Sequence, residues 1–549
     1  MFTTEDPGQL PDFEQYNYAT ILEDFEVSTE EVKKLLLKLN ENKAAGPDSI
    51  PPSVLSQAAE ELSEPLTILF RKTLKEGQIP DGWKMADVSP IFKKGSKAAV
   101  NNYRPVSLTC VACKVMEKLV RSKIMEHLAE NGIISKHQHG FVSGRSCSTQ
   151  LLEALDNWTQ TIEEGGTTDV IYMDYQKAFD SVPHRRLILK LEACGIQGNV
   201  LNWVKAFLSD RKQKVIVNGE ASAEGDVTSG IPQGSVLAPL LFVCYINDLP
   251  RGLKTSAKMF ADDTKLFTRS DTEEGPKNLQ EDLDKLQEWS NKWLLRFHPQ
   301  KCCVLKVGGE NDNKYYMEQN LPNGETNKIT LTTTKSEKDL GVVIDDKLSF
   351  KEHVAQVTKK ANWKVGLIRR SFDYLTEEVF TLLFKGMIRP LLEYGHCVWQ
   401  PCEKGLCSEI ENVQRRATRM LSHLQELPYP ERLKKLKLPS LEHRRLRGDM
   451  IETYKYLNGL YDTEQPKFVI ASALETEQQH RHLRGHSKKL HKPFYRRKIR
   501  TNFFSNRIIT TWNSLPESVI SAPSTNAFKN RLDEYWKDLP SVYNPTCQN

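Results

Sequence analysis

Apolar residues recur at helical spacing through the first part of the chain. Ser28 can cap a helix that has Glu31 in its first turn, and one face of this helix carries Val32, Leu35, Leu36 and Leu39. The helix is expected to end before the turn residues Gly46-Pro47. The same periodicity predicts helices within 53–76 and 110–130. Residues 1–26 have no recurring apolar face and are interpreted as a polar linker.

The middle of the chain alternates between short strand-like runs and helical patterns. Strands are predicted at 169–173, at 215–219 before a turn, on both sides of a polar turn within 258–268, and at 303–307. Helices are predicted at 176–193, 236–248 and 277–296, and the pattern beyond residue 350 is almost wholly helical. This mixture predicts an α+β core at residues 166–346 with helical segments on both sides.

Composition narrows the class of protein but identifies no partner. The chain has 549 residues, enough for roughly three or four domains. Its net charge of +5 is a weak indication, because net charge hides local patches such as the basic block at 481–500. The longest nearly apolar run, 236–246, is too short to span a membrane, and the N-terminus lacks the features of a secretory signal. We therefore expect an intracellular protein of nucleus and cytoplasm, neither secreted nor membrane-bound.

The cysteines favour a reducing compartment. Their number is odd, eleven, and their spacing is not that of a disulfide scaffold. Cys110 and Cys113 have the spacing of half a zinc site, but they lie in an apolar helical stretch and are interpreted as core residues. A zinc site among His396, Cys397, Cys402 and Cys407 stays a minor alternative.

The sharpest local signal for chemistry is the segment Phe260-Ala-Asp-Asp-Thr-Lys-Leu-Phe267. A hairpin would carry Asp262 and Asp263 at its tip. Two neighbouring carboxylates repel each other, and a hard divalent cation such as Mg²⁺ would relieve the repulsion. A solvated Asp-rich turn explains the pair almost equally well.

A third carboxylate, Asp174, ends a second strand-like run. Strand alternation places Val170, Tyr172 and Asp174 on one face. A carboxylate at the end of one strand, together with a pair on a hairpin, could hold two metal ions. One ion would activate a primer 3′ hydroxyl, and the other would stabilise the leaving pyrophosphate.

Between these elements lies a glycine-rich loop, Ser229-Gly-Ile-Pro-Gln-Gly-Ser235, that leads into a helix. Glycine would allow the backbone to approach a nucleotide closely, and Pro232 would stiffen the loop. Taken alone, the loop is more simply an ordinary helix-initiating turn.

Order and content of these segments resemble a known family. Asp174-Tyr-Gln-Lys-Ala-Phe-Asp180, Ile231-Pro-Gln-Gly-Ser-Val-Leu237 and Phe260-Ala-Asp-Asp263 closely resemble motifs A, B and C of reverse transcriptases, especially those of non-LTR (LINE-type) retrotransposons in the jockey and CR1-like groups. Further segments match the same family: Lys43-Ala-Ala-Gly-Pro-Asp48, Asn102-Tyr-Arg-Pro-Val-Ser-Leu108, Gln138-His-Gly-Phe141, Tyr245-Ile-Asn-Asp-Leu-Pro250 and Asp339-Leu-Gly-Val-Val343. The resemblance covers residues 30–420.

This resemblance implies an RNA-directed DNA polymerase with a right-hand fold, an α+β architecture of fingers, palm and helical thumb. The implied divisions are a linker at 1–26, an N-terminal extension and fingers at 27–165, a palm with motifs A to E at 166–346, a thumb at 347–430, and a basic helical C-terminal region at 431–549. The implied partners are template RNA, a DNA primer or nicked target DNA, and deoxynucleoside triphosphates. The implied cofactor is Mg²⁺, two ions per site, with Mn²⁺ as a substitute.

The resemblance also implies roles for single residues. Asp174, Asp262 and Asp263 are the catalytic, metal-binding carboxylates. Phe179 occupies the position of a sugar gate, where an aromatic ring would collide with a 2′ hydroxyl. The remaining expected nucleotide-binding residues are Arg104 at the triphosphate, Gln233 and Gly234 at the incoming nucleotide and template base, and Lys301 as a proton donor to pyrophosphate. Core or solvated roles are the alternatives for Phe179 and Lys301.

Basic residues in the later part of the chain are expected to hold nucleic acid by its phosphates. They are Lys359, Lys360, Lys364, Arg369, Arg370, Arg496 and Arg497. Phe494 and Tyr495 lie among the last of these, as would suit stacking on single strands. A solvated helix face and a disordered basic linker are the competing interpretations.

Two features depart from the family pattern. We find no room upstream for the endonuclease of complete elements, so target-primed reverse transcription would need an endonuclease in trans. We also find no constellation for RNase H. The alternatives to an active polymerase are a catalytically silent, truncated remnant that binds nucleic acid and a maturase-like splicing cofactor. The intact aspartates disfavour the remnant, and the flanking segments disfavour the maturase.

Overall fold

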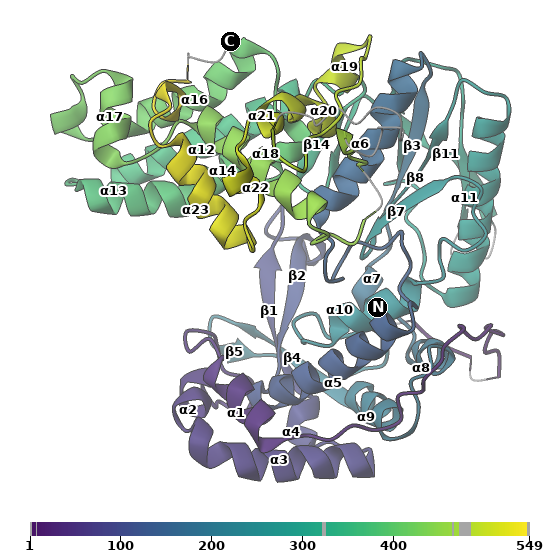
Figure 1. The fold of residues 1–549 in the computed structure, drawn as a ribbon. Coiled ribbons are helices and arrows are strands. Elements are labelled where there is room, and N and C mark those ends of the chain that lie inside the picture. Colours follow the sequence, from purple (N-terminus) through teal and green to yellow (C-terminus); the bar gives the residue numbers. More distant parts are fainter. Residues whose placement is uncertain (1–2, 7, 321–325, 464–465, 472–484, 546–549) are drawn as a thin grey trace.

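The computed structural model describes residues 3–6, 8–320, 326–463, 466–471 and 485–545. Helices and strands mix throughout, as the sequence predicts, and the helices extend on both sides of a central sheet (Figure 1). None of the helices in these ranges is both long and apolar enough to cross a lipid bilayer.

The central sheet has five strands in the order β12-β9-β3-β8-β7. Their bounds are β3 Thr168–Met173, β7 Ser256–Phe260, β8 Asp263–Arg269, β9 Cys303–Val307 and β12 Thr332–Thr334. β3 lies in the middle and is antiparallel to both β8 and β9, whereas the β12–β9 pair is parallel. The strands predicted at 169–173, within 258–268 and at 303–307 are therefore confirmed, and β3 joins them into one sheet.

A second sheet forms from strands in the N-terminal half. Its order is β2-β1-β4-β5, with β6 also paired to β4, and its strands are β1 Met85–Phe92, β2 Tyr103–Leu108, β4 Arg211–Val217, β5 Glu220–Ala221 and β6 Gly225–Val227. β1 and β2 form an antiparallel hairpin. Two further hairpins pair β10 Tyr316–Asn320 with β11 Thr326–Thr330, and β13 Ser336–Asp339 with β14 Val342–Asp345.

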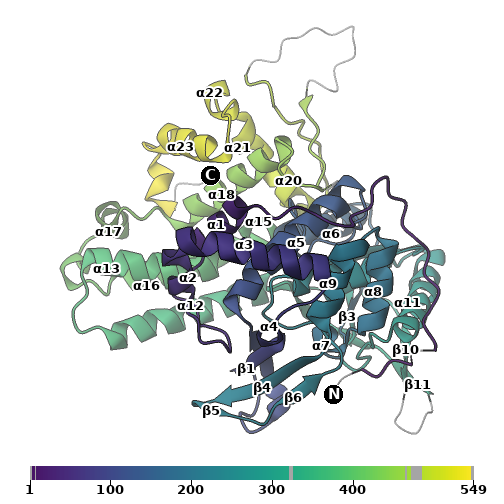
Figure 2. The same ribbon diagram turned by 90° about the horizontal axis from the view of Figure 1, so that it is seen from below.

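Helices of the N-terminal half surround these sheets. They are α1 Thr29–Leu37, α2 Pro52–Gln57, α3 Ala59–Glu76, α4 Asp81–Lys84, α5 Val111–Glu130, α6 Cys147–Glu163, α7 Ala178–Ser181, α8 His184–Ala193, α9 Gly198–Leu208, α10 Ala238–Ile246 and α11 Glu274–Trp293. α3 packs against α1 and α9, as the view from below shows (Figure 2).

The chain after β14 is helical. Its α-helices are α12 Lys351–Ser371, α13 Glu377–Leu383, α14 Arg389–Glu393, α15 His396–Trp399, α16 Lys404–Thr418, α17 Tyr429–Leu436, α18 Leu441–Leu457, α19 Lys498–Thr501, α20 Phe504–Arg507, α21 Ile509–Asn513, α22 Glu517–Ile520 and α23 Thr525–Trp536. α12 packs against α16, and α18 against α23 (Figure 1).

Local signals account for several helix ends. The Ser28 hydroxyl accepts a hydrogen bond from the Glu31 N–H, so the predicted cap of α1 is confirmed. The single helix predicted at 176–193 is wrong, because the structure has two, α7 and α8. Val182-Pro183 separates them, and proline disfavours helical backbone at the residue before it.

Both faces of the central sheet are buried, each in a different apolar core. Ile171 and Leu266 belong to a core shared with α5, α8, α9, α10 and α11. Val170 and Phe267, on the opposite face, belong to a second core with α6 and the C-terminal helices. The alternation along β3 and β8 therefore sends successive side chains into two different cores.

The end segments of the chain are tied into this architecture. Residues 8–26, part of the segment 1–26 interpreted above as a polar linker, run along α8 and α9. The Tyr16 N–H bonds to Ala193 O, and the Gln197 N–H bonds to Leu22 O. The C-terminal helices contribute Trp512, Phe528 and other buried side chains to the second core. Both ends therefore depend on contacts far away in the sequence.

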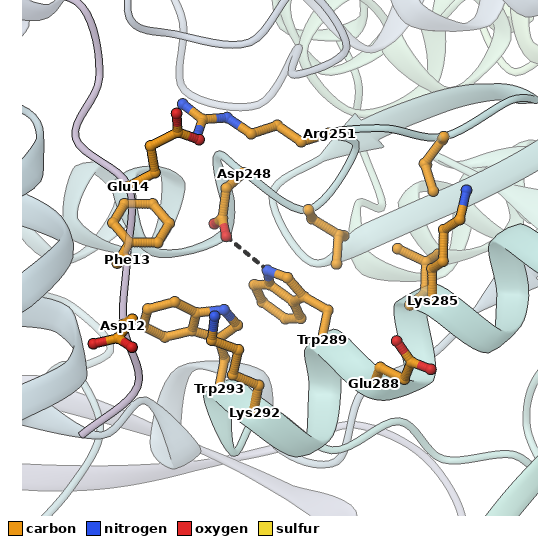
Figure 3. Close-up of a pocket in the computed structure, with 13 residues that line it drawn as sticks. Asp12, Phe13, Glu14, Asp248, Arg251, Lys285, Glu288, Trp289, Lys292 and Trp293 are labelled. Atoms are coloured by element: carbon orange, nitrogen blue, oxygen red, sulfur yellow. Dashed lines mark hydrogen bonds between the residues drawn. The ribbon is translucent and has the colours of Figure 1, made fainter. Parts of the chain in front are cut away.

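A buried lysine lies beneath the N-terminal segment. The Lys190 ammonium sits 3.7 Å from the Trp293 ring centre and 5.3 Å from that of Phe13, and it pairs with Asp248. Burial lowers the pKa of Lys190 to about 8, while the Asp248 carboxylate acts in the opposite direction. Beside this cluster is a pocket of about 520 Å³, lined in part by Asp12, Trp289 and Trp293 (Figure 3). The segment predicted as a linker thus forms one wall of the pocket.

The packing of the C-terminal helices predicts a contrast between two aromatic residues. Trp512 is fully buried, whereas Tyr535 is 50% exposed on α23. We expect Trp512→Ala to lower the free energy of unfolding by about 3–5 kcal/mol, because it leaves a large cavity in the second core. Tyr535→Ala should change it by less than about 0.5 kcal/mol. Guanidinium unfolding followed by circular dichroism measures both, and equal stability of the two variants would contradict the packing of these helices.

Candidate active site

The two adjacent aspartates lie at the tip of the β7–β8 hairpin. Phe260, the last residue of β7, pairs with Asp263, the first of β8. Ala261, between Phe260 and Asp262, has a φ of +53°, in the left-handed region. This tight turn places Asp262 and Asp263 beyond the part of the hairpin whose Leu266 and Phe267 enter the two cores. The hairpin predicted from the sequence is confirmed.

Asp174 lies beside this turn because of the sheet register. Met173, the last residue of β3, pairs with Thr264 of β8, so Asp174, the residue after β3, is level with the turn that carries Asp262 and Asp263. Asp174 is further fixed by its backbone, since its carbonyl accepts a hydrogen bond of 2.8 Å from the His298 N–H. The structure therefore brings together the three aspartates that the sequence singles out.

Crowded negative charge dominates the electrostatics of this site. Removal from water raises the pKa of Asp262, and the carboxylate of Asp174 raises it further. Removal from water also raises the pKa of Asp263, together with the charges of Asp262, Asp339 and Asp174, to about 6. A cation placed among these oxygens would favour the charged forms.

Lys301 supplies one such cation. Its ammonium lies 3.2 Å from a carboxylate oxygen of Asp174, and both side chains are about half exposed. The sequence predicts Lys301 near the nucleotide, and the structure places its ammonium directly against the carboxylate of Asp174. Lys301 therefore neutralises Asp174 in this conformation.

A pocket of about 330 Å³ opens on this face of the sheet, lined by Asp174, Asp263 and Lys301 among others. Its floor contains an ion pair that the sequence analysis missed, between Lys265 of β8 and Asp339 of β13. Burial lowers the pKa of the Lys265 ammonium, and Asp339 opposes that change. Strand alternation from Asp263 could have placed Lys265 on the same face, but its partner lies 74 residues away.

The glycine-rich loop packs against the protein itself. A Cβ on Gly230 would lie 2.6 Å from the Asp180 carbonyl oxygen, and one on Gly234 would lie 2.3 Å from the Ser107 carbonyl oxygen. Both glycines also have positive φ. We predicted that these glycines let the backbone approach a nucleotide. The structure shows that glycine is needed at both positions because the loop already lies against the backbone of β2 and α7. Gln233 donates a hydrogen bond from its side-chain amide to Asp180.

Phe179 lies next to this loop. Its carbonyl accepts a hydrogen bond from the Ile231 N–H, and its ring stacks on Phe242 of α10 with centres 4.5 Å apart. The side chain is only partly buried. The ring is thus held by the core on one side and open on the other.

The β1–β2 hairpin brings positive charge to the aspartates. Arg104 lies opposite Ile91 on this hairpin and is exposed. The charges of Arg104 and Lys93 lower the pKa of Asp262, although burial and Asp174 outweigh them. The charges of the β1–β2 hairpin in the second sheet therefore act on the aspartates of the central sheet.

The predicted nucleic-acid-binding residues fall into two places. Lys359, Lys360, Lys364, Arg369 and Arg370 all lie on α12, and all but Lys364 are exposed. Trp363, which we did not predict, is 59% exposed on the same helix. The sequence could have predicted this exposure, because the helical pattern puts Trp363 on the polar face of the helix among the lysines.

Arg496 and Arg497 precede α19 and are exposed, while their backbone N–H groups bond to Glu163 of α6. Residues 481–484 of the basic block lie outside the described residues. The rest of the block is not uniformly exposed, because Arg500 is buried and pairs with Asp156 at 2.7 Å. Phe494 is 89% exposed.

In the described ranges, no group of three or more His, Cys, Asp or Glu side chains converges closely enough to hold a metal ion. This holds for the cysteines at 397–407, of which Cys397 is buried and Cys402 exposed. It holds also for the three aspartates, where Lys301 faces Asp174. The donor chemistry at the Asp262-Asp263 turn nevertheless fits a hard divalent cation, because the donors are carboxylate oxygens, and removal from water together with mutual repulsion raises the pKa of Asp262 and Asp263.

Comparison with known proteins agrees with this geometry. Residues 91–351 match the family described as "Reverse transcriptase (RNA-dependent DNA polymerase)". The RNA-directed DNA polymerase from mobile element jockey of Drosophila melanogaster is 28% identical over 411 residues, which cover 72% of this chain and 44% of that protein. The probable RNA-directed DNA polymerase from transposon BS of the same species is 26% identical over 420 residues, 73% of this chain and 45% of that protein.

The matched segment contains all three aspartates, the glycine-rich loop, β2 with Arg104 and the last two residues of β1. Residues 91–351 are therefore a reverse transcriptase domain. Within that class, the chain is a relative of RNA-directed DNA polymerases of mobile elements, and it spans less than half the length of the relatives it matches.

The two ion pairs of this site predict effects of very different size on the free energy of unfolding. Asp339→Asn leaves the buried Lys265 ammonium without its counter-charge, so we expect a loss of about 3–5 kcal/mol in the free energy of unfolding. Lys301→Met removes a half-exposed pair and should change that energy by less than about 1 kcal/mol. Chemical denaturation in guanidinium measures both. A large loss of unfolding free energy for Lys301→Met, with no loss for Asp339→Asn, would contradict the description of the first pair as solvent-screened and the second as buried.

Proposed function

We propose that this chain is an RNA-directed DNA polymerase that extends a DNA primer along the RNA of a mobile element. In this proposal the central sheet is the palm, the β1–β2 hairpin with its surrounding helices is the fingers, and the helices from α12 to α16 are the thumb. The domain bounds predicted from the sequence, palm 166–346 and thumb 347–430, follow the change from sheet to helix after β14. The C-terminal region from 431 supports the thumb through the second core.

One observation carries the proposal. Asp174, just after β3, lies beside the pair Asp262-Asp263 on the neighbouring turn, and removal from water together with the nearby carboxylates raises the pKa of Asp262 and Asp263. An unmet excess of negative charge of this kind, within a reverse transcriptase domain, is what a cation-dependent polymerase site needs. It also favours an active enzyme over a silent remnant that only binds nucleic acid.

Asp174, Asp262 and Asp263 would hold two Mg²⁺ ions, or Mn²⁺ in their place. When bound, the ions supply charge stabilisation at the attacking 3′ hydroxyl and at the leaving pyrophosphate. Lys301 would balance the charge of Asp174 before catalysis, as its contact with that carboxylate supports, and would then donate a proton to pyrophosphate. In this proton transfer, the Lys301 ammonium would act as a general acid and the leaving pyrophosphate would accept its proton.

The nucleotide itself would lie between the two sheets. Arg104 offers paired N–H donors to the triphosphate, which a guanidinium does better than an ammonium. Gln233 and Gly234 border the incoming nucleotide and the template base, with Gln233 anchored on Asp180. Phe179, whose ring is backed by Phe242, would collide with a 2′ hydroxyl and so select deoxynucleotides.

The duplex product would lie along α12. Its five basic residues can hold phosphates without reading sequence, and the exposed Trp363 ring can pack against sugars or bases. Arg496 and Arg497, with Phe494 nearby in sequence, would hold a single-stranded part of the template. We further propose that the primer is the nicked end of target DNA, with the nick made by an endonuclease of the same element or in trans.

The metal-ligand role is tested by primer extension. With poly(rA)/oligo(dT), dTTP and Mg²⁺, we expect wild-type protein to extend the primer and Asp262→Asn to lose at least about 10³-fold in rate, because a ligand carboxylate is replaced by a neutral amide. Template–primer affinity, measured by fluorescence anisotropy, should stay within a few-fold of wild type.

Two results would count against this assignment. An active Asp262→Asn variant would refute the role of that carboxylate. Absence of extension by folded wild-type protein that still binds template–primer would favour the silent remnant.

The sugar gate gives a separate prediction. Phe179→Ala removes the ring that would meet the 2′ hydroxyl, so we expect the preference for dTTP over UTP to fall by about 30- to 150-fold, because about 2–3 kcal/mol of steric exclusion is lost. Phe179→Tyr keeps the ring and should keep the preference. The ratio of kcat/KM for the two nucleotides measures the effect, and an unchanged ratio in Phe179→Ala would exclude the gate.

A further inference from the structure

Residues 135–141, the loop between α5 and α6, lie directly against the catalytic hairpin. The His139 N–H bonds to Met259 O and the Met259 N–H bonds to His137 O, both at 2.9 Å. These two bonds join Gln138 to β7 as a short parallel bridge. The loop thus extends the edge of the central sheet next to the turn that carries Asp262.

The Gln138 side chain continues this contact into the turn itself. It is fully buried, and its carbonyl oxygen accepts hydrogen bonds from the Gly140 N–H at 2.7 Å and the Ala261 N–H at 2.9 Å. Ala261 is the residue before Asp262 and has the positive φ of the turn. A left-handed conformation at a residue with a side chain is strained and persists only where its surroundings impose it. The amide of Gln138 supplies such a restraint.

Gly140 makes the contact possible. A Cβ at this position would lie 2.4 Å from the Ala261 nitrogen and 2.9 Å from the Phe260 carbonyl carbon. Any side chain at Gly140 would therefore displace the catalytic turn. Steric exclusion explains this glycine, because its φ is outside the positive region.

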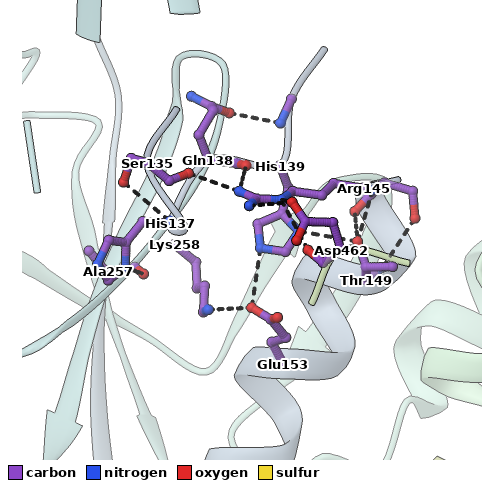
Figure 4. Close-up of polar contacts among 12 residues, drawn as sticks. Ser135, His137, Gln138, His139, Arg145, Thr149, Glu153, Ala257, Lys258 and Asp462 are labelled. Atoms are coloured by element: carbon purple, nitrogen blue, oxygen red, sulfur yellow. Dashed lines mark hydrogen bonds and ion pairs between the residues drawn. The ribbon is translucent and has the colours of Figure 1, made fainter. Parts of the chain in front are cut away.

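The loop is itself rigidly held, as Figure 4 shows. The Arg145 guanidinium donates hydrogen bonds to Ser135 O at 2.8 Å and to Gln138 O at 2.7 Å, and it pairs with Asp462 at 2.7 Å. His139 contacts Glu153 of α6, which also pairs with Lys258 of β7. Side chains from α6, β7 and the C-terminal region therefore fix the loop, and with it the backbone position of Gln138.

We propose that Gln138 is a positioning residue for the polymerase reaction: its side-chain oxygen sets the conformation of the Ala261 turn and through it the carboxylates of Asp262 and Asp263. This proposal rests on the proposed function. Gln138 touches neither substrate nor metal in this role. It acts on the reaction through the backbone of the turn, which distinguishes it from the catalytic aspartates.

Three substitutions separate positioning from simple core packing. Gln138→Met fills nearly the same volume but removes the strong acceptor, so the Ala261 N–H is left unpaired. Gln138→Glu keeps oxygen acceptors at the same distance along the side chain. Gln414→Met is the matched control, because Gln414 is also buried, lies on α16, and its amide donates a hydrogen bond to Pro439 O.

The first measurement is hydrogen exchange, by mass spectrometry, of a peptide that covers 259–263. We expect the Ala261 amide to lose its protection in Gln138→Met and to keep it in Gln138→Glu and Gln414→Met. The second measurement is single-turnover primer extension. A misplacement of about 1 Å can cost about 10²-fold in rate, so we expect that loss in Gln138→Met, with template–primer affinity within about two-fold of wild type. Gln138→Glu should be about ten-fold faster than Gln138→Met, because a factor of ten in rate corresponds to the free energy of about one hydrogen bond.

Each outcome decides the proposal. Unchanged protection in Gln138→Met would show that the contact does not restrain the turn, and lost protection with an unchanged rate would show that the restraint does not position the carboxylates. If Gln138→Met fails to fold, Gln138→Glu decides: protection and a rate within about ten-fold of wild type support positioning, and loss of protection overturns it. An inactive wild type would instead refute the proposed function, and the positioning role with it.

Discussion

Burial of the central sheet on both faces is the constraint on which the site depends. Val170 and Phe267 enter one core, and Ile171 and Leu266 enter the other, so a shift of β3 against β8 by one residue would exchange apolar side chains between two cores of different shape. This fixes the register in which Met173 faces Thr264. The position of Asp174 beside the catalytic turn follows from that register, as does the direction in which the three carboxylates point.

The carboxylates of the site carry more negative charge than the neighbouring basic side chains neutralise. Two lysines in different environments pair with carboxylates here. Lys301 is half exposed against Asp174, so its attraction is screened by water and it can leave when a stronger cation arrives. Lys265 is buried against Asp339 and cannot leave without a large cost. The first pair suits a residue that changes partner during a reaction, and the second ties the catalytic strand to the β13–β14 hairpin.

The C-terminal region belongs to the same physical unit as the catalytic sheet. Trp512 and Phe528 share a core with Val170 and Phe267, and Arg500 pairs with Asp156 of α6. Asp462 reaches the loop that contacts the catalytic turn through Arg145. Deletion of the basic tail would therefore uncover a core, whereas substitution of Arg496 and Arg497, which are exposed, would change charge alone.

The sequence by itself determined what local physics controls. The cap at Ser28, the hairpin around Asp262-Asp263 and the strand before Asp174 follow from spacing within a few residues, and the structure has all three. The motif order was enough to indicate a reverse transcriptase. Only the tertiary structure decided which basic side chains are solvated and which are paired. Arg500 and Arg497 look alike in the sequence, yet the first is buried against a carboxylate 344 residues away and the second is exposed. A charge pattern does not contain the position of such a distant partner, and burial of a charge is stable only where that partner lies.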